Sequence, residues 1–455
     1  MKIPRIVIAA TQSSSGKTTI VTGLLAELRS RGLKVQSFKV GPDYIDPGYH
    51  KLASGRTAHN LDTWLVPKAK LPQIFAAESV GADIAVIEGV MGLYDGGRGG
   101  ISSTAEIAKL LDAPVLLVID CKSMGASAAA IAKGFRDYDE DIKLAGVILN
   151  KLGSDTHEEM IKQAMQKINM PVYGSLRRNT EIATPERHLG LLPVEENNQL
   201  FIEKMRSMVS ASVDVDGILA LANRAAAIKS VNGDIFSKDK EIKCTIGIAK
   251  DEAFSFYYST SLAVLENLGA RIVPFSPLHD KEIPPVDGII IGGGFPEMFA
   301  AKLAANTALR ESLKCAAENN MPIYAECGGY MYLMQSIVDF SGHEYKMAGI
   351  FDGQAQMTKK LQMVGYVEAE LTTDSVIGKK GTKLHGHEFH FSIDDQSIEN
   401  RPFCFTKLRN NASYLAGQAK YQTIGSYLHL HFAGASNVAE SFVQSCTSYK
   451  LTKEK

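Results

Sequence analysis

Short apolar runs alternate with helical segments over the first 200 or so residues of the chain. The runs are RIVIAAT, KVQSFKVG, ADIAVIEGV, APVLLVID and LAGVILNK, and helical patterns such as TTIVTGLLAELRSRG separate several of them. Strands that are apolar throughout are buried on both faces, which is typical of a parallel sheet covered by helices on each side. The sequence therefore predicts a doubly wound α/β domain.

A second alternation of the same kind begins near residue 244, with the runs CTIGIAKD, ARIVPFSP, VDGIIIGGG and MPIYAECGG. Between the two, a short Ala-rich helix passes into a polar stretch without an apolar period. A chain of 455 residues is also too long for one ordinary core. We expect two α/β domains, at 1–212 and 244–455, joined by a linker at 213–243.

Composition excludes several classes of partner. The formal net charge of −1 gives no electrostatic reason to expect a nucleic acid or an anionic membrane surface. No apolar run approaches the roughly 20 residues that a membrane-spanning helix needs. The six cysteines are scattered without a CxxC pair, which argues against a zinc site or a disulfide framework. A reducing cytoplasm is the expected compartment.

The stretch IVIAATQSSSGKTTI has the ending of a phosphate-binding loop, Gly16-Lys17-Thr18, but Thr11 stands where such a loop normally opens with glycine. In these loops backbone N–H groups at a helix N-terminus bind phosphate. Lys17 would reach the β- and γ-phosphates, and the Thr18 hydroxyl would bind Mg²⁺. The alternative is a Ser/Gly-rich turn without a ligand. We predict a nucleotide site whose candidate residues are Thr11, Ser15, Gly16, Lys17, Thr18 and Thr19.

Acidic residues follow two of the predicted strands. Asp43 and Asp46 come after one, and Glu88 ends another. Ligands of open α/β sheets bind at the carboxyl ends of the strands, and Mg²⁺ takes one or two carboxylates besides phosphate oxygens. For Asp43 and Asp46, turn formation in GPDYIDPG is the alternative. For Glu88 the alternative of a role without a ligand is weaker, because an acid beside a buried strand is costly without a partner.

Two further polar groups follow later strands of the first half. Asn150 and Lys151 end the run LAGVILNK, a position suited to contact with an adenine, although a solvated loop pair explains them as well. The segment TPERHLGLLP at 184–193 contains Glu186, Arg187 and His188. Its residues alone favour a solvated turn as much as a function.

The second half contains the pattern of a nucleophile elbow. IYAECGGYMYL predicts a strand, a sharp turn and a helix, with Cys327 at the turn. A helix N-terminus favours the thiolate. Gly328 and Gly329 allow a tight turn, and the glycines at 292–294 are a source of a second oxyanion donor. The alternative is an inert buried cysteine.

A cysteine nucleophile needs a base, and GSYLHLHF offers His429 and His431. Strand alternation points these two side chains to opposite faces, so only one can meet Cys327. LHGHEFHFS adds His385, His387, Glu388 and His390. This run could suggest a metal, but it has neither an HExxH helix nor cysteine partners.

Together these motifs resemble the cobyrinic acid a,c-diamide synthase family, from the phosphate-binding loop to the C-terminal histidines. The matching segments are GPDYIDPGYH, VIEGVMGLYDG, PERHLGLLP, AECGGYMYL, GHEFHFS and SYLHLHF. The resemblance implies an N-terminal P-loop NTPase-like domain of the dethiobiotin synthetase type and a C-terminal class I glutamine amidotransferase-like domain. It also implies a carbon–nitrogen ligase of cobalamin biosynthesis that uses ATP, Mg²⁺ and glutamine to amidate the a and c carboxylates of cobyrinic acid.

Roles follow from the resemblance position by position. Thr18, Asp43 and Glu88 would bind Mg²⁺, and Asp43, Tyr44, Asp46 and Glu88 would organise the acceptor carboxylate. Asn150 and Lys151 would belong to the ATP site. Cys327 would attack glutamine beside Gly293, Gly294, Gly328 and Gly329. His429 would be the base, because related enzymes carry it in a Tyr-Leu-His context that matches Tyr427-Leu428-His429.

The chain departs from the family pattern in two places. Ala10 and Ser14 replace glycines of the phosphate loop. His431 stands where many class I amidotransferases have a glutamate, so we expect a Cys327–His429 dyad without an orienting acid. Weak glutaminase activity is then expected unless the synthetase site is occupied.

Other functions fit parts of the pattern. Amidation of Ni-sirohydrochlorin uses a near-identical layout, and cobyric acid synthase is a more distant relation. A partitioning-type switch ATPase would carry a second, early lysine in the loop, which ATQSSSGKTT lacks. The expected partners are a small tetrapyrrole, ATP and glutamine, without nucleic acid or membrane, and the resemblance allows a homodimer.

Overall fold

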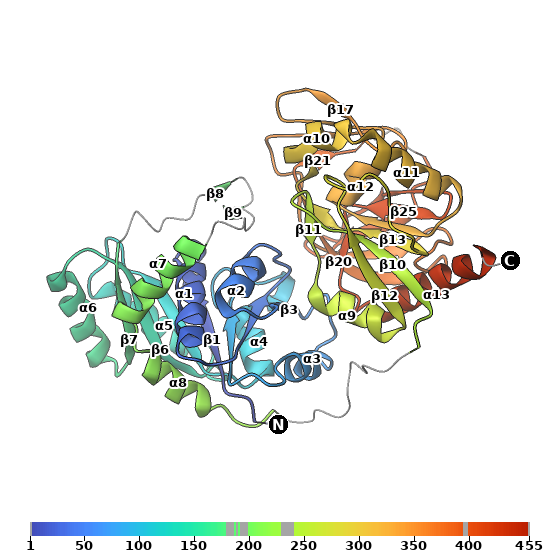
Figure 1. The fold of residues 1–455 in the computed structure, drawn as a ribbon. Helices are drawn as coiled ribbons and strands as arrows, with labels where there is room; N and C mark the ends of the chain where they lie inside the picture. The colour runs from blue at the N-terminus through green and yellow to red at the C-terminus, as the bar shows by residue number, and fades with distance from the viewer. Residues whose placement is uncertain are drawn as a thin grey trace. The chain divides into compact units, whose positions relative to one another are not determined.

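A computed structural model of the chain describes residues 2–178, 186–187, 190–191, 199–228, 241–394 and 399–453. It divides into two compact units (Figure 1). The first unit comprises Met1–Thr63 and Pro67–Ile235, and the second comprises Trp64–Val66 and Phe236–Lys455. No helix in the described parts of the chain has both the length and the apolar character that a membrane span requires.

The first unit is built on a seven-stranded parallel sheet. In spatial order its strands are β3 (His59–Leu61), β2 (Val35–Val40), β4 (Ile84–Glu88), β1 (Arg5–Ala10), β5 (Val115–Asp120), β6 (Leu144–Leu152) and β7 (Val172–Arg177). Its helices are α1 (Lys17–Ser30), α2 (Asp46–Ser54), α3 (Leu71–Glu78), α4 (Thr104–Leu110), α5 (Ser127–Asp137), α6 (Asp155–Lys167), α7 (Gln199–Ser212) and α8 (Val215–Asn223). The sheet order changes direction at β1, which places the loop after β1 at the switch point where such sheets bind ligands.

Strand β1 is buried on both of its faces, and this burial positions the phosphate-binding loop that follows it. Ile6, Ile8 and Ala10 face one core together with Leu24 and other apolar residues of α1. Val7 and Ala9 are equally buried, so β1 is enclosed on both faces, as its unbroken apolar run predicts. The strand and helix on either side of the loop are thereby fixed.

Part of the expected linker belongs to the core of the first unit. Helix α8 covers residues 215–223 and packs against β1 and β7, and its Val215, Ile218 and Leu221 belong to the same buried cluster as residues of α1 and α7. The apolar side chains recur at helical spacing, which the Ala-rich composition had obscured. Residues 229–240 of the same segment lie outside the described residues. Of the segment 184–193, only the two short strands β8 (Glu186–Arg187) and β9 (Gly190–Leu191) are described, and His188 is not.

The second unit contains a six-stranded sheet that is parallel except at one edge. Its strands are β12 (Ala270–Phe275), β10 (Cys244–Ala249), β13 (Gly288–Ile291), β15 (Ile323–Glu326), β25 (Thr423–Ser426) and the antiparallel β24 (Gln418–Lys420). Its helices are α9 (Ser259–Asn267), α10 (Ala300–Ala305), α11 (Thr307–Glu318), α12 (Gly328–Leu333) and α13 (Ser436–Lys453).

Additional sheets extend this second unit. An antiparallel sheet joins β23 (Ser413–Ala416), β22 (Phe403–Lys407), β19 (Met363–Leu371), β20 (Lys383–His390) and β26 (His429–Leu430). A smaller sheet joins β17 (Glu344–Lys346), β16 (Ser336–Val338), β18 (Gln354–Met357) and β21 (Ser392–Ile393), and β11 (Phe254–Phe256) pairs with β14 (Gly293–Gly294). Two consequences bear on function: β15 lies inside the six-stranded sheet, and β26 brings the C-terminal histidines against β20.

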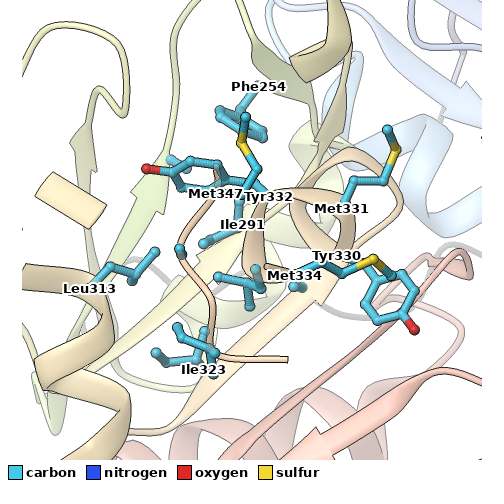
Figure 2. Close-up of a cluster of buried hydrophobic side chains, with 14 of the residues drawn as sticks. Phe254, Ile291, Leu313, Ile323, Tyr330, Met331, Tyr332, Met334 and Met347 are labelled. Carbon is cyan, nitrogen blue, oxygen red and sulfur yellow. The ribbon is translucent and has the colours of Figure 1, made fainter. Parts of the chain in front are cut away.

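Helix α12 is short but completely buried. Tyr330, Tyr332 and Met334 pack into a cluster with Ile291 of β13 and Ile323 of β15, as Figure 2 shows. A six-residue helix has little stability of its own, so this packing is what fixes its N-terminus. That N-terminus is where the predicted nucleophile lies.

Candidate active sites in the two units

The candidate phosphate-binding loop connects β1 to α1, the strand and helix that the sequence predicts on either side of it. Helix α1 begins at Lys17, and Gly16 before it adopts a left-handed φ of 85°. Any other residue would be strained at this φ, and its Cβ, 2.3 Å from Asn150 Nδ2, would displace that side chain. The buried Lys17 extends across the loop and donates to the Met91 carbonyl at 2.8 Å. Its ammonium group is thus held at the end of β4 near the predicted phosphate site.

The remaining loop residues have structural contacts of their own. Thr11 is half-buried, and its N–H donates to Val118 O of β5. The Ser15 hydroxyl donates to Gln12 O at 2.9 Å, and Thr19 is half-buried in the first turn of α1. The Thr11 bond ties the start of the loop to β5, and the Ser15 bond ties the loop to its own backbone.

Asn150 and Lys151 brace the loop from the end of β6. Asn150 Nδ2 donates to Ser15 O at 2.8 Å. Lys151 Nζ donates to Ser14 O at 2.8 Å and pairs with Asp120 at 2.7 Å. Both side chains therefore engage the loop backbone, and contact with an adenine stays a prediction.

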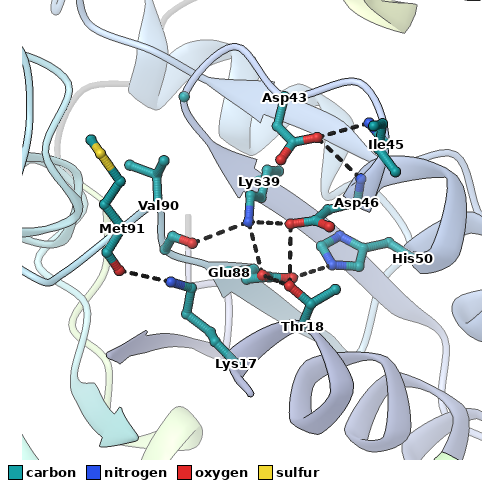
Figure 3. Close-up of polar contacts among 12 residues, drawn as sticks. Lys17, Thr18, Lys39, Asp43, Ile45, Asp46, His50, Glu88, Val90 and Met91 are labelled. Atoms are coloured by element: carbon teal, nitrogen blue, oxygen red, sulfur yellow. Dashed lines mark hydrogen bonds and ion pairs between the residues drawn. The ribbon is translucent and has the colours of Figure 1, made fainter. Parts of the chain in front are cut away.

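A buried polar cluster lies beside Lys17, at the carboxyl ends of β2 and β4 (Figure 3). Lys39 Nζ lies 2.5 Å from Asp46 Oδ2 and 2.8 Å from Glu88 Oε1. The Thr18 hydroxyl donates to Glu88 Oε1 at 2.7 Å and lies 3.3 Å from Asp46 Oδ2. His50 Nε2 lies 2.6 Å from Glu88 Oε2. Thus Glu88, which is fully buried, has partners on both carboxylate oxygens.

The charges in this cluster depend on one another. Burial alone would raise the pKa of Glu88, but Lys39 and the His50 hydrogen bond lower it well below its usual range. Burial would likewise lower the pKa of Lys39, and Asp46 and Glu88 raise it instead. Burial, followed by repulsion from Lys39, lowers the pKa of Lys17 to about 8. The cluster therefore holds a charged Lys39–Glu88 pair next to a phosphate-loop lysine that loses its proton easily.

The two aspartates of GPDYIDPG differ in their contacts. Asp43 Oδ1 accepts the backbone N–H groups of Ile45 and Asp46, at 2.7 and 3.1 Å, and so organises the turn into α2. Turn formation is the alternative that the sequence analysis gives for Asp43. Asp46 reaches the cluster itself. The adjoining Tyr44 is half-buried.

The cluster also bears on the predicted magnesium ion. The oxygens of Thr18, Asp46 and Glu88 converge, and oxygen is the donor that Mg²⁺ prefers. No group of three or more His, Cys, Asp or Glu side chains suited to a metal is found in the described part of the chain. Mg²⁺ usually completes its shell with phosphate and water, so two carboxylates and a hydroxyl fit it. The geometry favours Asp46 over Asp43 as the second carboxylate.

In the second unit, Cys327 lies at a strained turn between β15 and α12. Its φ of 47° and ψ of −104° are unusual for a residue other than glycine. The Cys327 N–H donates to Ser426 O of β25 at 2.8 Å, which ties the turn to the sheet. The strain is maintained by the burial of α12 and presents the thiol at the helix N-terminus.

The four glycines predicted around Cys327 are each needed for close packing. A Cβ at Gly328 would lie 3.1 Å from Gly294 N, and one at Gly329 would lie 2.1 Å from Ile291 O. A Cβ at Gly294 would meet Ala253 O at 2.0 Å. At Gly293 it would meet His429 Cε1 at 2.6 Å. The Gly293–Gly294 segment thus passes beside the start of α12, where backbone N–H groups of both could face an oxyanion.

His429 is the histidine that meets the nucleophile. Burial alone would lower its pKa, but contact with Cys327, including a hydrogen bond, together with Glu326 raises the pKa to about 10. Its Nδ1 lies 3.6 Å from Glu326 Oε2. The structure therefore places a carboxylate beside the base, supplied by the residue before the nucleophile, where the sequence led us to expect a dyad without an acid.

The other histidines of this region have different contacts. The His431 ring stacks on Tyr258, with centroids 4.8 Å apart, and its Nδ1 accepts the Ala433 N–H. The His387 ring stacks on His429, with centroids 4.8 Å and planes 13° apart, and its Nε2 lies 2.9 Å from the Tyr258 hydroxyl. Of the His-rich run of β20, His387 therefore packs against the candidate base.

Comparison with known proteins matches both units. Residues 6–192 match the CobQ/CobB/MinD/ParA nucleotide binding domain, and residues 245–437 match the CobB/CobQ-like glutamine amidotransferase domain. A protein of Dehalococcoides mccartyi strain CBDB1 named cobyrinate a,c-diamide synthase is 44% identical over 458 residues, covering 98% of each chain. The chain belongs to the cobyrinate a,c-diamide synthase family.

Other members of this family have similar sequence identity to this chain. Proteins of the same name from Listeria monocytogenes strain F2365 and Methanobrevibacter smithii are 44% and 43% identical, covering 94% and 95% of this chain and 96% and 97% of their own. Membership confirms the predicted fold class, two α/β domains of the P-loop and amidotransferase types, and the predicted enzyme class, a glutamine-dependent amide-forming ligase.

Three residues of the sites were missed in the sequence. Lys39 lies within the apolar strand β2, and His50 lies in α2. Glu326 ends β15. The available signal was the same for Lys39 and Glu326: a charged side chain in a strand that is otherwise buried is costly without a partner, which points to one nearby.

Proposed function

We propose that this enzyme uses ATP and glutamine to convert the a and c carboxylates of cobyrinate to amides. The observation that carries the proposal is that each unit holds half of that chemistry at the ends of its strands. The first unit has a lysine and an oxygen cluster suited to phosphoryl transfer, and the second has a Cys–His pair suited to releasing ammonia. The names of the relatives supply the substrate.

The first half-reaction activates the carboxylate. A carboxylate resists nucleophiles because it is negatively charged and its oxygen leaves poorly. Its oxygen attacks the γ-phosphorus of ATP, the bond to the β-phosphate oxygen breaks, and an acyl phosphate and ADP form. Lys17 stabilises the charge that develops on the phosphate oxygens, and the backbone N–H groups of the loop orient them.

The oxygen cluster supports this step. Thr18, Asp46 and Glu88 would hold Mg²⁺, which neutralises phosphate charge. Lys39, buried between the two carboxylates, holds both in place and lowers the pKa of Glu88. His50 positions Glu88 from its other side. These residues thus supply a preorganised site without large rearrangement.

The second half-reaction releases ammonia. The Cys327 thiolate attacks the side-chain carbonyl carbon of glutamine, and backbone N–H groups near Gly294 and Gly328 stabilise the oxyanion. His429 gives a proton to the leaving nitrogen as the C–N bond breaks. Water activated by His429 then hydrolyses the thioester and releases glutamate.

The two halves meet at the acyl phosphate. Ammonia attacks its carbonyl carbon, a C–N bond forms, and phosphate leaves. Each amide formed consumes one ATP, one glutamine and one water, and yields ADP, phosphate and glutamate. Ammonia is mostly protonated in neutral water, so passing it internally keeps it reactive.

The test is mass spectrometry of cobyrinate incubated with enzyme, ATP, Mg²⁺ and glutamine. We expect two carboxyl-to-amide conversions. A Cys327→Ala variant should lose them with glutamine and regain them with ammonium, whereas a Lys17→Ala variant should lose them with both. The Lys17→Ala variant should still hydrolyse glutamine.

Two results would count against the proposal. An enzyme that hydrolyses glutamine and ATP but leaves cobyrinate unchanged would transfer the assignment to Ni-sirohydrochlorin, the closest alternative substrate. An enzyme without ATP turnover on either tetrapyrrole would contradict the ligase assignment.

A further inference from the structure

Glu326 is a buried carboxylate whose two oxygens have different partners. Its side chain ends β15, directly before Cys327, and only 7% of the residue is exposed. Oε1 accepts the Tyr324 hydroxyl at 2.8 Å and the Leu430 N–H at 3.0 Å. Oε2 lies 3.6 Å from His429 Nδ1. The oxygen that holds the fold and the oxygen that faces the base are thus distinct.

The sheet pairing explains why this acid meets this histidine. Strand β15 pairs with β25 in a register that sets Glu326 opposite Ser426. The chain then passes through Tyr427 and Leu428 to His429, which begins β26. The hydrogen bond from Leu430 N to Glu326 fixes the backbone immediately after His429. One carboxylate therefore holds both the main chain and the ring of the histidine.

One face of the His429 ring is covered by another histidine. His387 stacks on it, and burial, followed by the proximity of His429, lowers the pKa of His387 well below its usual range. Among the described residues, Cys327 and Glu326 raise the pKa of His429, and the neighbouring His387 is neutral. A carboxylate at Nδ1 favours a proton there, which leaves Nε2 to exchange a proton with the sulfur.

We propose that Glu326 is the positioning residue for His429, so that a Cys327–His429–Glu326 triad replaces the expected dyad. It takes the place of the glutamate that many class I amidotransferases have two residues after the histidine, where this chain has His431. The proposal rests on the proposed role of Cys327 and His429 in glutamine hydrolysis. It reverses the expectation of weak glutaminase activity from a missing acid.

The direct test is Glu326→Gln. The amide oxygen can still accept from Leu430 N and Tyr324, so the fold contact is kept, while the amide nitrogen replaces the oxygen that faces Nδ1. That nitrogen donates a hydrogen bond, and it favours the tautomer with its proton on Nε2. We expect kcat for glutamine hydrolysis to fall by about 10²- to 10⁴-fold, as when the orienting acid of a catalytic triad becomes an amide.

Two readouts separate positioning from a structural role. The alkylation profile, meaning the rate of Cys327 alkylation by iodoacetamide as a function of pH, should shift to higher pH in Glu326→Gln. The reason is that the imidazolium that stabilises the thiolate has lost its carboxylate. Amidation supported by ammonium should remain within about twofold of wild type, since it does not use this site. Glutaminase and alkylation rates are measured without a tetrapyrrole, so failure of the proposed substrate would leave this test intact.

Glu388→Gln is the matched control. Glu388 is another buried carboxylate of the second unit, at 2% exposure, and it binds the Tyr414 hydroxyl. The Glu388→Gln substitution should leave the alkylation profile of Cys327 unchanged. Glu326→Asp keeps the charge and should retain the wild-type pH profile at a lower rate. The proposal is overturned if Glu326→Gln has the wild-type glutaminase rate and profile, or if Glu326→Asp shifts the profile as far as Glu326→Gln.

Discussion

Lys17 has a charge that depends on pH within the working range of an enzyme. Its pKa is lowered to about 8 by burial and then by Lys39. Raising the pH above about 8 removes the proton from the free enzyme, and ATP binding must then restore it. We predict that kcat/KM for ATP falls as the pH rises through this value, while kcat at saturating ATP does not, because bound phosphate keeps Lys17 charged.

Lys17→Arg is the control for this prediction. A guanidinium stays charged at every pH used, so the fall in kcat/KM for ATP above pH 8 should disappear even if the rate is lower. Steady-state kinetics with saturating cobyrinate and ammonium would isolate the ATP site. If the wild-type kcat/KM for ATP stays level to pH 10, deprotonation of Lys17 does not control ATP binding, and the prediction is wrong.

At this scale, sequence reasoning finds residues whose role depends on a local pattern. Lys17, Thr18 and Cys327 follow from their neighbours in the chain. Lys39 and Glu88 are 49 residues apart, and they meet only because β2 and β4 pair in the sheet. Glu326 is adjacent to Cys327, but its partner His429 comes from a strand about 100 residues later. A single sequence does not contain those pairings.

The element that most constrains catalysis is α12. A Cβ at Gly329 would lie 2.1 Å from Ile291 O, and a backbone atom of the sheet cannot move aside. We predict that Gly329→Ala displaces the start of α12, and with it Cys327. A shift of about 1 Å at a reacting group costs about 100-fold in rate. Glutamine-supported amidation should fall by this factor, and ammonium-supported amidation should be unchanged.

Gly247→Ala is the matched substitution in the same unit. Gly247 lies in the buried strand β10, and a Cβ there would make ordinary contacts at 3.4 Å with Phe275 and Val286. Glutamine-supported amidation by this variant should stay near that of wild type. Equal losses in the two variants would show that any added methyl disturbs the unit, and the argument for α12 would fail.

At the same scale, the sequence predicts five strands of the first unit, β1, β2, β4, β5 and β6, but not the short edge strand β3 or the edge strand β7. Its apolar runs are continuous, and tertiary structure does not alter what they predict. The sequence predicts a linker over the residues of helix α8, because their short apolar pattern adjoins a polar segment. The antiparallel sheet of β19, β20, β22, β23 and β26 was also missed. Two of its pairings, β19 with β22 and β20 with β26, join strands that are not consecutive in the chain, which local periodicity does not reveal.

At the scale of the whole molecule, the proposed reaction is divided between two folded units, each with its candidate site at the ends of parallel strands. This division predicts how the nitrogen source governs the pH dependence. Free ammonium must lose a proton before it can attack, so amidation by Cys327→Ala with subsaturating ammonium should rise about tenfold per pH unit near neutrality. Ammonia formed from glutamine within the enzyme does not pass through that equilibrium.

We therefore predict that wild-type amidation with glutamine does not follow this slope between about pH 6.5 and 7.5, because internal delivery supplies the unprotonated nucleophile. Amide formation would be counted by mass spectrometry at each pH, with and without an ammonia-consuming enzyme in the mixture. The scavenger should abolish amidation by Cys327→Ala with ammonium and leave the glutamine reaction unaffected. If it suppresses both reactions alike, ammonia reaches the acyl phosphate through bulk water, and the two units act as separate enzymes on one chain.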